Sequence, residues 1–313
     1  MVATGPIAAV GAATPATIPN AGERVDLVTE VAARVESTRE ARWIVDHVDA
    51  AFRTGGKATS ARVAALEMAD RRAAGEPLQY VLGTWPFRSL ELAVDRRVLI
   101  PRPETEQVVE IALGELTRIA EARSVNGRPL ICVDLGTGSG AIALALASEG
   151  APPDRLLEVW ATDASADALD VARSNRDALA AADPVAAGRV TFVEGSWFDA
   201  LPDRLARRID LIVSNPPYVA EEEYDDLDPT VREWEPRSAL VAPRGRSGVA
   251  GMADVETVVA GSATWLAQSG ALVVELAPSQ AYGAIDAARR AGLSRVETAR
   301  DLAGRLRMLV AQR

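Results

Sequence analysis

The residues with the clearest chemical potential are Asn215, Pro216, Pro217 and Tyr218, which directly follow the apolar run 209–214. The side-chain oxygen of Asn215 and the backbone carbonyl of Pro216 can each accept one N–H of an NH2 group. The prolines stiffen the turn, and Tyr218 offers a flat face to a planar amide or base. This turn would direct the lone pair of a weakly nucleophilic nitrogen towards an electrophile.

A second group of residues is typical of a nucleotide-like cofactor site. The apolar run 130–134 leads into a glycine-rich turn and then into an alanine-rich helical stretch, as in open α/β sheets that bind such cofactors. The next apolar run, 158–163, ends on Asp163, whose carboxylate can take both ribose hydroxyls of an adenosyl group. The residues of the glycine-rich turn are Gly136, Thr137, Gly138, Ser139 and Gly140.

Together the two groups indicate methyl transfer from a sulfonium cofactor to a planar nitrogen. No general base is required, because the electrophile already carries its charge and the proton can leave after the methyl group has moved. Each motif alone has a structural reading: the turn 215–218 as a stiff connection, and the Gly-x-Gly-x-Gly spacing as a tight turn that differs from the dinucleotide pattern. Their places at the ends of two strands favour a ligand site.

The elements that must position these residues alternate strand and helix from residue 130 onward, which predicts a Rossmann-like parallel sheet with right-handed crossovers. A long insert, 219–249, separates the fourth and fifth strands and should shape the substrate site. The seven predicted strands are 130–134, 158–163, 190–194, 209–214, 271–276, 295–299 and 306–310. The main helices are expected at 140–148, 166–180, 252–268 and 279–291.

The segment before this sheet predicts a different architecture. Residues 1–20 are rich in Ala, Thr, Pro and Gly and are expected to be a disordered extension. Residues 21–76 show helical spacing of apolar residues and predict a small bundle, in which Val25 and Val63 belong to the apolar faces. Residues 77–100 predict a hairpin linker, and 101–313 the catalytic domain.

Composition and charge limit the classes of partner that the protein can bind. The chain has 313 residues and a formal net charge of −10, and the whole acidic excess lies after Leu90. Nucleic-acid binding depends on neutralising phosphates with Lys and Arg, so a protein substrate is favoured over direct nucleic-acid contact. No apolar run approaches a membrane span. The single cysteine, Cys132, fits a cytoplasmic protein with a buried core thiol, and no metal site is expected.

Residues 76–313 resemble the release-factor glutamine N5-methyltransferases, which use S-adenosylmethionine. The resemblance implies a class I methyltransferase sheet with an N-terminal helical bundle that holds the release factor. It further implies sulfonium contact by residues 136–140, ribose contact by Asp163, adenine packing by Trp197 and glutamine-amide binding by residues 215–218. The matching motifs are Glu76-Pro77-Leu78-Gln79-Tyr80, Ile100-Pro101-Arg102-Pro103-Glu104-Thr105-Glu106, Asp134-Leu135-Gly136-Thr137-Gly138-Ser139-Gly140, Ser196-Trp197-Phe198, Asn215-Pro216-Pro217-Tyr218 and Glu235-Pro236-Arg237-Ser238-Ala239-Leu240.

The implied reaction methylates the side-chain amide of the glutamine in the Gly-Gly-Gln motif of peptide-chain release factors and yields S-adenosylhomocysteine. We expect Asn215, Pro216 and Tyr218 to act in catalysis, Asn215 to touch both cofactor and substrate, and the enzyme to be a monomer. The sequence departs from the family at Ala277 and Pro278, where a glycine usually follows the glutamate.

Three alternatives remain open from the sequence. A related branch of the family methylates a glutamine of a ribosomal protein. An amino-methyltransferase acting on adenine or guanine in nucleic acid would present the same NH2 geometry, although it should carry a basic groove or a target-recognition domain. A non-catalytic relative would be expected to lose Asp163, the glycines or Asn215, and all of them are present.

Overall fold

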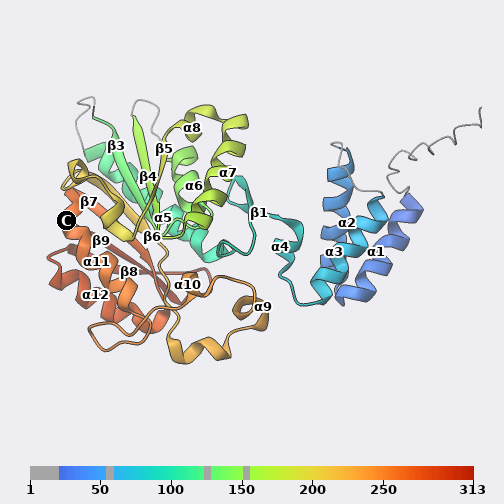
Figure 1. Ribbon diagram of the computed structural model, residues 1–313. Coiled ribbons are helices and arrows are strands. Elements are labelled where there is room, and N and C mark those ends of the chain that lie inside the picture. The colour runs from blue at the N-terminus through green and yellow to red at the C-terminus, as the bar shows by residue number, and fades with distance from the viewer. Residues whose placement is uncertain (1–20, 54–59, 123–127, 151–155) are drawn as a thin grey trace, which may run out of the picture. The chain divides into compact units, whose positions relative to one another are not determined.

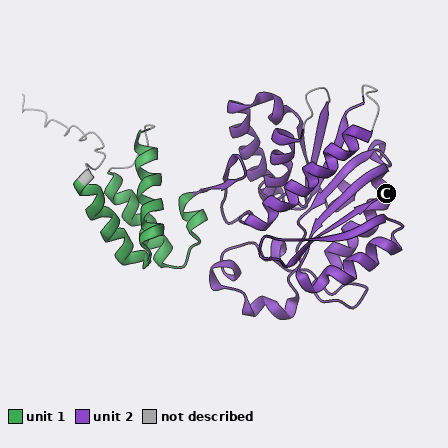
Figure 2. Cartoon of the chain, turned by 180° about the vertical axis from the view of Figure 1, so that it is seen from behind, with its two compact units in different colours: residues 1–82 green, residues 83–313 purple. Residues whose placement is uncertain are grey.

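The computed structural model describes residues 21–53, 60–122, 128–150 and 156–313. The chain divides into two compact units, Met1–Leu82 and Gly83–Arg313, shown in Figure 2. The expectation of disorder for residues 1–20 lies outside the described residues. Among the described helices, none combines the length and the apolar character that a bilayer span requires.

The first unit is helical. Its apolar side chains recur at helical spacing and pack into one small core that includes Leu27, Val31, Ile44 and Val48. The predicted face was partly wrong, because Val25 is 65% exposed and the buried positions of the first helix are shifted towards Leu27. The helices are α1 (Ala21–Val35), α2 (Thr38–Arg53), α3 (Ala61–Ala73) and α4 (Leu78–Leu82). Val63, also expected on an apolar face, is 43% exposed.

The second unit begins with a short antiparallel hairpin, β1 (Thr84–Phe87) and β2 (Leu90–Ala93). The hairpin is shorter than the predicted segment 77–100, because residues 78–82 form helix α4 of the first unit. Phe87 and Leu92 are buried in the main core, so the hairpin is packed onto the large sheet.

The large sheet has seven strands in the order β5-β4-β3-β6-β7-β9-β8. The first five are parallel, which confirms the Rossmann-like prediction. At one edge the sheet is antiparallel, because β9 lies between β7 and β8 and runs antiparallel to both. The strands are β3 (Leu130–Leu135), β4 (Leu157–Asp163), β5 (Val190–Glu194), β6 (Ile209–Ser214), β7 (Leu266–Glu275), β8 (Ser294–Arg300) and β9 (Leu306–Gln312).

Helices cover both faces of this sheet, as Figure 1 shows. Successive side chains of a strand point to opposite faces of the sheet, so alternate residues of β3 belong to different cores. Leu130 and Cys132 pack with α5 and α6 on one face. Ile131 and Val133 pack with α11 and α12 on the other. The helices are α5 (Pro103–Ala122), α6 (Ala141–Glu149), α7 (Ala166–Ala182), α8 (Pro184–Gly188), α11 (Ala253–Trp265) and α12 (Ala281–Arg290). The predicted helix 252–268 ends early, because β7 starts at Leu266.

Several short elements complete the second unit. Between β6 and β7, the predicted insert carries three of them and is tied back by hydrogen bonds between Val219 and residues 240 and 242. Cys132 is buried, as expected for a cysteine of the core, and this burial raises the pKa of its thiol. The short elements are η1 (Trp197–Ala200), η2 (Asp203–Leu205), η3 (Glu221–Asp226), α9 (Pro229–Arg232), α10 (Arg237–Leu240) and η4 (Pro278–Gln280).

Candidate active site

The sheet brings the two predicted groups of residues to one edge. Leu135 at the end of β3 pairs with Thr162 of β4 on one side and with Ser214 of β6 on the other. The chain therefore leaves the sheet at the same level after each of these strands. Ligands bind at this edge in open α/β sheets, because the carboxyl ends of parallel strands meet there.

A cavity of about 410 Å³ lies at this edge. Six of the site residues expected from the sequence line it: Gly136, Gly138, Asp163, Trp197, Asn215 and Pro217. Cofactor and substrate candidates from separate strands thus share one hollow. Further residues of its wall are Arg97, Val98, Leu99, Ala164, Ser165, Ala168, Gly195, Ser196, Pro236, Ser238, Ala239 and Asp254.

The glycine-rich turn needs glycine for a physical reason. Gly136 has a φ of 74°, and a Cβ added there would lie 3.3 Å from the indole ring of Trp197. The N–H groups of Gly136 and Thr137 both donate to the carbonyl of Thr162 at 2.9 Å, which holds the turn against β4. The ring of Trp197 can therefore lie close to the backbone of the turn, at the wall of the cavity.

The other residues of the turn do not line the cavity. The hydroxyl of Thr137 donates to Asp134 at 2.6 Å, and Ser139 is buried with its carbonyl accepting a hydrogen bond from Asn175 at 2.9 Å. Gly140 is the N-cap residue of α6. These residues shape the turn, and a direct cofactor contact by Thr137, Ser139 or Gly140 stays a prediction.

Asp163 sits between the turn and the cavity. Its Oδ2 accepts the N–H of Gly138 at 2.8 Å and its Oδ1 accepts the N–H of Ser165 at 2.9 Å. Burial raises the pKa of this carboxyl, while the hydrogen bonds from backbone N–H groups act in the opposite direction. Each carboxylate oxygen offers more than one acceptor position, so both can still receive hydroxyl donors.

Asn215 reaches the cavity, whereas two of its neighbours do not. The Nδ2 group of Asn215 donates to the hydroxyl of Thr105 at 3.2 Å. Pro216 is buried and Tyr218 is half-buried; neither lines the cavity. The hydroxyl of Tyr218 donates to Glu275 at 3.3 Å. The catalytic roles expected for Pro216 and Tyr218 therefore stay predictions.

The loop with Ala277 and Pro278, where the sequence departs from its family, supports the turn 215–218. The N–H of Ala277 donates to the side-chain oxygen of Gln280 at 3.1 Å. The amide nitrogen of the same side chain donates to the carbonyls of Tyr218 and Gly251, each at 2.9 Å. Ala277 and Pro278 thus lie at the start of the short helical turn η4, whose buried Gln280 holds the backbone carbonyl of Tyr218 in place.

One contact that sequence reasoning missed joins the two walls of the cavity. Glu235 is buried, accepts the N–H of Ile100 at 3.0 Å and forms an ion pair with Arg102. Residues 97–99 on one wall and residues 236–239 on the other are thereby connected. Ile100, Arg102 and Glu235 belong to motifs of the family resemblance, but their contact spans more than a hundred residues and leaves no local pattern.

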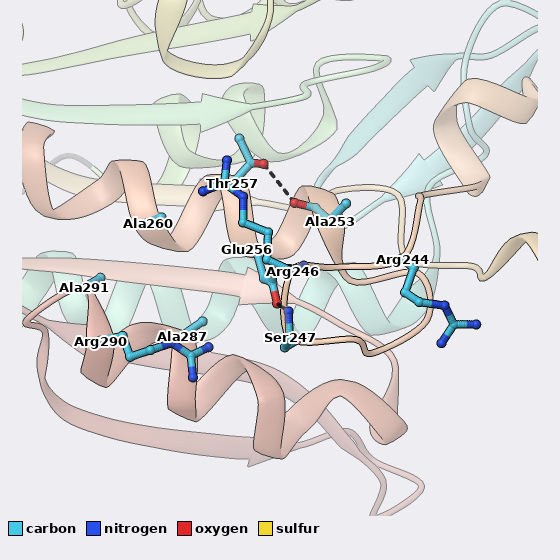
Figure 3. A pocket seen from close by; sticks show the side chains of 10 residues that line it. All are labelled: Arg244, Arg246, Ser247, Ala253, Glu256, Thr257, Ala260, Ala287, Arg290 and Ala291. Atoms are coloured by element: carbon cyan, nitrogen blue, oxygen red, sulfur yellow. Dashed lines mark hydrogen bonds between the residues drawn. The ribbon is translucent and has the colours of Figure 1, made fainter.

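A larger hollow of about 730 Å³ lies between α11, α12 and residues 244–247, as Figure 3 shows. Arg244, Arg246 and Arg290 surround it, but the carboxylate of Glu256 also faces it and accepts the N–H groups of Arg246 and Ser247 at 2.6 and 3.0 Å. None of the site residues expected from the sequence lines this hollow. The cavity at the strand ends is therefore the candidate active site.

Comparison with known proteins agrees with this geometry. Residues 124–229 match the family described as methyltransferase small domain. The release factor glutamine methyltransferase of Burkholderia pseudomallei is 42% identical over 246 residues, which is 78% of each chain. The enzyme of that name from Xylella fastidiosa (strain Temecula1) is 36% identical over 307 residues, or 98% of each chain.

Similarity to solved structures is more distant. The N-terminal domain of human METTL16 in complex with SAH is 14% identical, with a TM-score of 0.47, and the match covers 79% of this chain and 82% of that one. The sequence relatives carry the assignment, because they span most of both chains at well over 30% identity. The protein described here belongs to the release factor glutamine methyltransferase family.

Proposed function

We propose that this enzyme transfers the methyl group of S-adenosylmethionine to the side-chain amide nitrogen of a glutamine in a peptide-chain release factor. One observation carries the proposal: Gly136 and Gly138 of the glycine-rich turn line a single cavity with Asp163 and Asn215, at the carboxyl ends of neighbouring strands. The relatives' names agree with this reaction. We further propose that the methylated residue is the glutamine of the release factor's Gly-Gly-Gln motif.

The residues present fit an S-adenosyl cofactor. The missing side chain at Gly136 leaves room for close approach to the turn, and the indole of Trp197 offers an aromatic wall suited to adenine. The carboxylate of Asp163 supplies acceptors suited to the ribose hydroxyls. When bound, the cofactor supplies a methyl group on a positively charged sulfur.

Asn215 and Pro216 would hold the substrate amide. An amide nitrogen is a weak nucleophile, because its lone pair is delocalised into the carbonyl group. The side-chain oxygen of Asn215 and the backbone carbonyl of Pro216 would each accept one N–H, favouring the pyramidal nitrogen that develops positive charge. Tyr218 braces this turn through Glu275. After transfer, the extra proton can leave to water without a protein base.

The character of the chain supports a protein substrate. The formal net charge of −10 opposes unaided binding of a polyanion. The acidic helix η3 and the rest of the insert that follows the turn 215–218 offer a surface suited to a basic polypeptide segment. We further propose that the helical unit of residues 21–82 contributes to binding the release factor, as the family resemblance implies.

The decisive experiment is methyl transfer from labelled S-adenosylmethionine to a purified release factor. Three controls accompany it: a release factor whose loop glutamine is replaced by alanine, purified ribosomal proteins, and DNA. We expect label in the release factor with the intact glutamine alone. Label in ribosomal protein or DNA instead would overturn the substrate assignment, and mass spectrometry of the labelled peptide identifies the modified atom.

A further inference from the structure

The side chain of Asn215 is held through its amide nitrogen. Its Nδ2 donates to Oγ1 of Thr105 at 3.2 Å, and that hydroxyl donates to Oε2 of Glu275 at 2.8 Å. Thr105 lies in the first turn of α5, and Glu275 is the last residue of β7. The exposed fractions are 4% for Thr105 and 1% for Glu275, so water cannot readily replace either group.

The direction of this hydrogen-bond chain follows from the chemistry of its ends. An ionised carboxylate can only accept hydrogen bonds, and a hydroxyl has a single proton to give. The hydroxyl of Tyr218 donates to Oε1 of Glu275 at 3.3 Å, so both carboxylate oxygens receive hydroxyl donors. The proton of Thr105 is therefore committed to Glu275, and the oxygen of Thr105 can only accept from Asn215.

This commitment decides which end of the Asn215 amide is available. With the amide reversed, Oδ1 would face the oxygen of Thr105, and two acceptors would meet without a proton between them. Asn215 would then present an NH2 group to a substrate that also offers NH2. Among the described residues, no donor is hydrogen-bonded to Oδ1 of Asn215 in the observed orientation, which leaves this oxygen available as an acceptor.

We propose that Thr105 and Glu275 are positioning residues for methyl transfer: they hold the amide of Asn215 in the one orientation whose oxygen can accept the N–H of the substrate amide. This inference rests on the proposed function, because it assigns a purpose to the acceptor side of Asn215. Neither residue touches the reacting atoms; both act through Asn215.

The surroundings of Glu275 support a role other than stability. A buried carboxylate loses hydration, which disfavours its charged form. Two neutral hydroxyls are the hydrogen-bond donors that the structure gives this carboxylate, and the nearby cation Arg307 donates instead to the carbonyl of Leu276. Burial raises the pKa of Glu275 to about 7. Retaining an acid at this position makes sense where an acceptor-only group must direct a chain of hydroxyls.

The test compares Thr105→Val, which keeps the shape and removes the hydroxyl, with Thr105→Ser, which keeps the hydroxyl. Thr105→Val should lower kcat by roughly tenfold or more, the scale for weakening one transition-state acceptor. The Kd for S-adenosylhomocysteine should stay within about twofold, because Thr105 does not line the cavity that holds Asp163. Thr105→Ser should keep most of the activity. Thr117→Val is the matched control, since Thr117 lies on the same helix and its hydroxyl donates to the carbonyl of Leu113, far in sequence from Asn215 and Glu275.

A double-mutant cycle with Asn215→Ala separates positioning from general structural damage. If Thr105 acts through Asn215, adding Thr105→Val to Asn215→Ala should change kcat by less than about twofold. A further loss equal to that in the wild-type background would overturn the inference, as would unchanged kcat in Thr105→Val. Should Thr105→Val fail to fold in a thermal unfolding assay, Thr105→Ala takes its place in the same cycle.

The outcomes also separate this inference from the proposed function. Wild-type enzyme that leaves the release factor unlabelled would refute the proposed function. Wild-type enzyme that labels it, together with an additive cycle, would refute only the positioning role of Thr105.

Discussion

Asp163 and Gly138 are joined by a hydrogen bond of 2.8 Å, in which a carboxylate oxygen at the end of β4 accepts the backbone N–H at the centre of the glycine-rich turn after β3. The same carboxylate lines the cavity. One side chain thus shapes the turn and offers acceptors to a ligand. Changing it should affect cofactor binding more than the reacting nitrogen, which is held by a different strand.

Asp163→Ala is expected to weaken binding of S-adenosylhomocysteine by roughly tenfold or more, because a buried charged acceptor and the brace of Gly138 are both lost. Isothermal titration calorimetry measures this Kd directly. Asp177→Ala provides the control, since Asp177 is an exposed carboxylate on α7 whose partner is the neighbouring Arg176. Wild-type affinity in Asp163→Ala would remove Asp163 from the cofactor site.

Asn215→Ala should lower the rate of methyl transfer and leave cofactor binding nearly unchanged, the reverse of the effect expected for Asp163→Ala. We expect kcat for release-factor methylation to fall by about a hundredfold or more, because an acceptor that strengthens in the transition state is removed. The Kd for the cofactor product should change little. Single-turnover measurements with saturating cofactor test this split, and unaltered turnover would show that the amide is held by other groups.

Gly251 supports the substrate turn at very close range. A Cβ at this position would lie 2.4 Å from the carbonyl oxygen of Tyr218, and Gly251 also has a φ of 64°. Gly251→Ala should lower the free energy of unfolding by about 1–3 kcal/mol, because strain and overpacking add. It should also lower kcat, since the turn must shift. Chemical denaturation and steady-state kinetics give the two numbers.

Gly248→Ala is the matched control for Gly251→Ala. Gly248 has a φ of 85°, but a Cβ there would meet nothing within 4 Å. The substitution should carry only the backbone strain of roughly 1–2 kcal/mol and leave kcat unchanged. Equal kcat losses in the two variants would mean that contact with Tyr218 is unimportant for turnover.

The activity should rise with pH around neutrality. Burial raises the pKa of Glu275 from 4.5 to about 7, with hydrogen bonds from Thr105 and Tyr218 and the charge of Arg307 opposing it and Glu104 adding to it. Below this pKa a protonated Glu275 can itself donate to Thr105, which releases the orientation of Asn215. The kcat/KM ratio of wild type to Glu275→Gln should therefore increase between about pH 6 and pH 8. A ratio that does not change with pH would contradict this expectation.

The stability should change with pH in the opposite direction. Because the pKa of Glu275 is higher in the folded state, the folded protein holds a proton that the unfolded chain has lost between pH 4.5 and about 7. The stabilisation by this bound proton is complete below the pKa of Glu275 in the unfolded chain, and it is lost as the pH rises through the pKa of Glu275 in the folded protein. Burial also raises the pKa of Asp134 to about 7, so it contributes with the same sign. Tm should fall from about pH 5 to pH 8, and less steeply in Glu275→Gln.

Local pattern was enough to predict the strands and the residues at their ends. The strands before Gly136 and Asn215 are buried along their whole length, as expected for parallel strands covered on both faces, and their largely apolar sequences reflect this burial. Parallel strands present their carboxyl ends together, so the meeting of the turn 136–140, Asp163 and Asn215 could be anticipated as well.

Tertiary structure alone decided which side chains are buried and in what order the last strands lie in the sheet. Val25 and Val63 follow helical spacing yet are exposed, because the packing partner and not the period determines the buried face. The strand β9 lies between β7 and β8, an order that no single segment specifies.

Asn215 meets Thr105 across 110 residues, and Thr105 meets Glu275 across 170. Sequence determined the acceptor and the end of the strand that carries it, because these depend on adjacent residues. The orientation of that acceptor depends on side chains that become neighbours only when α5, β6 and β7 pack together.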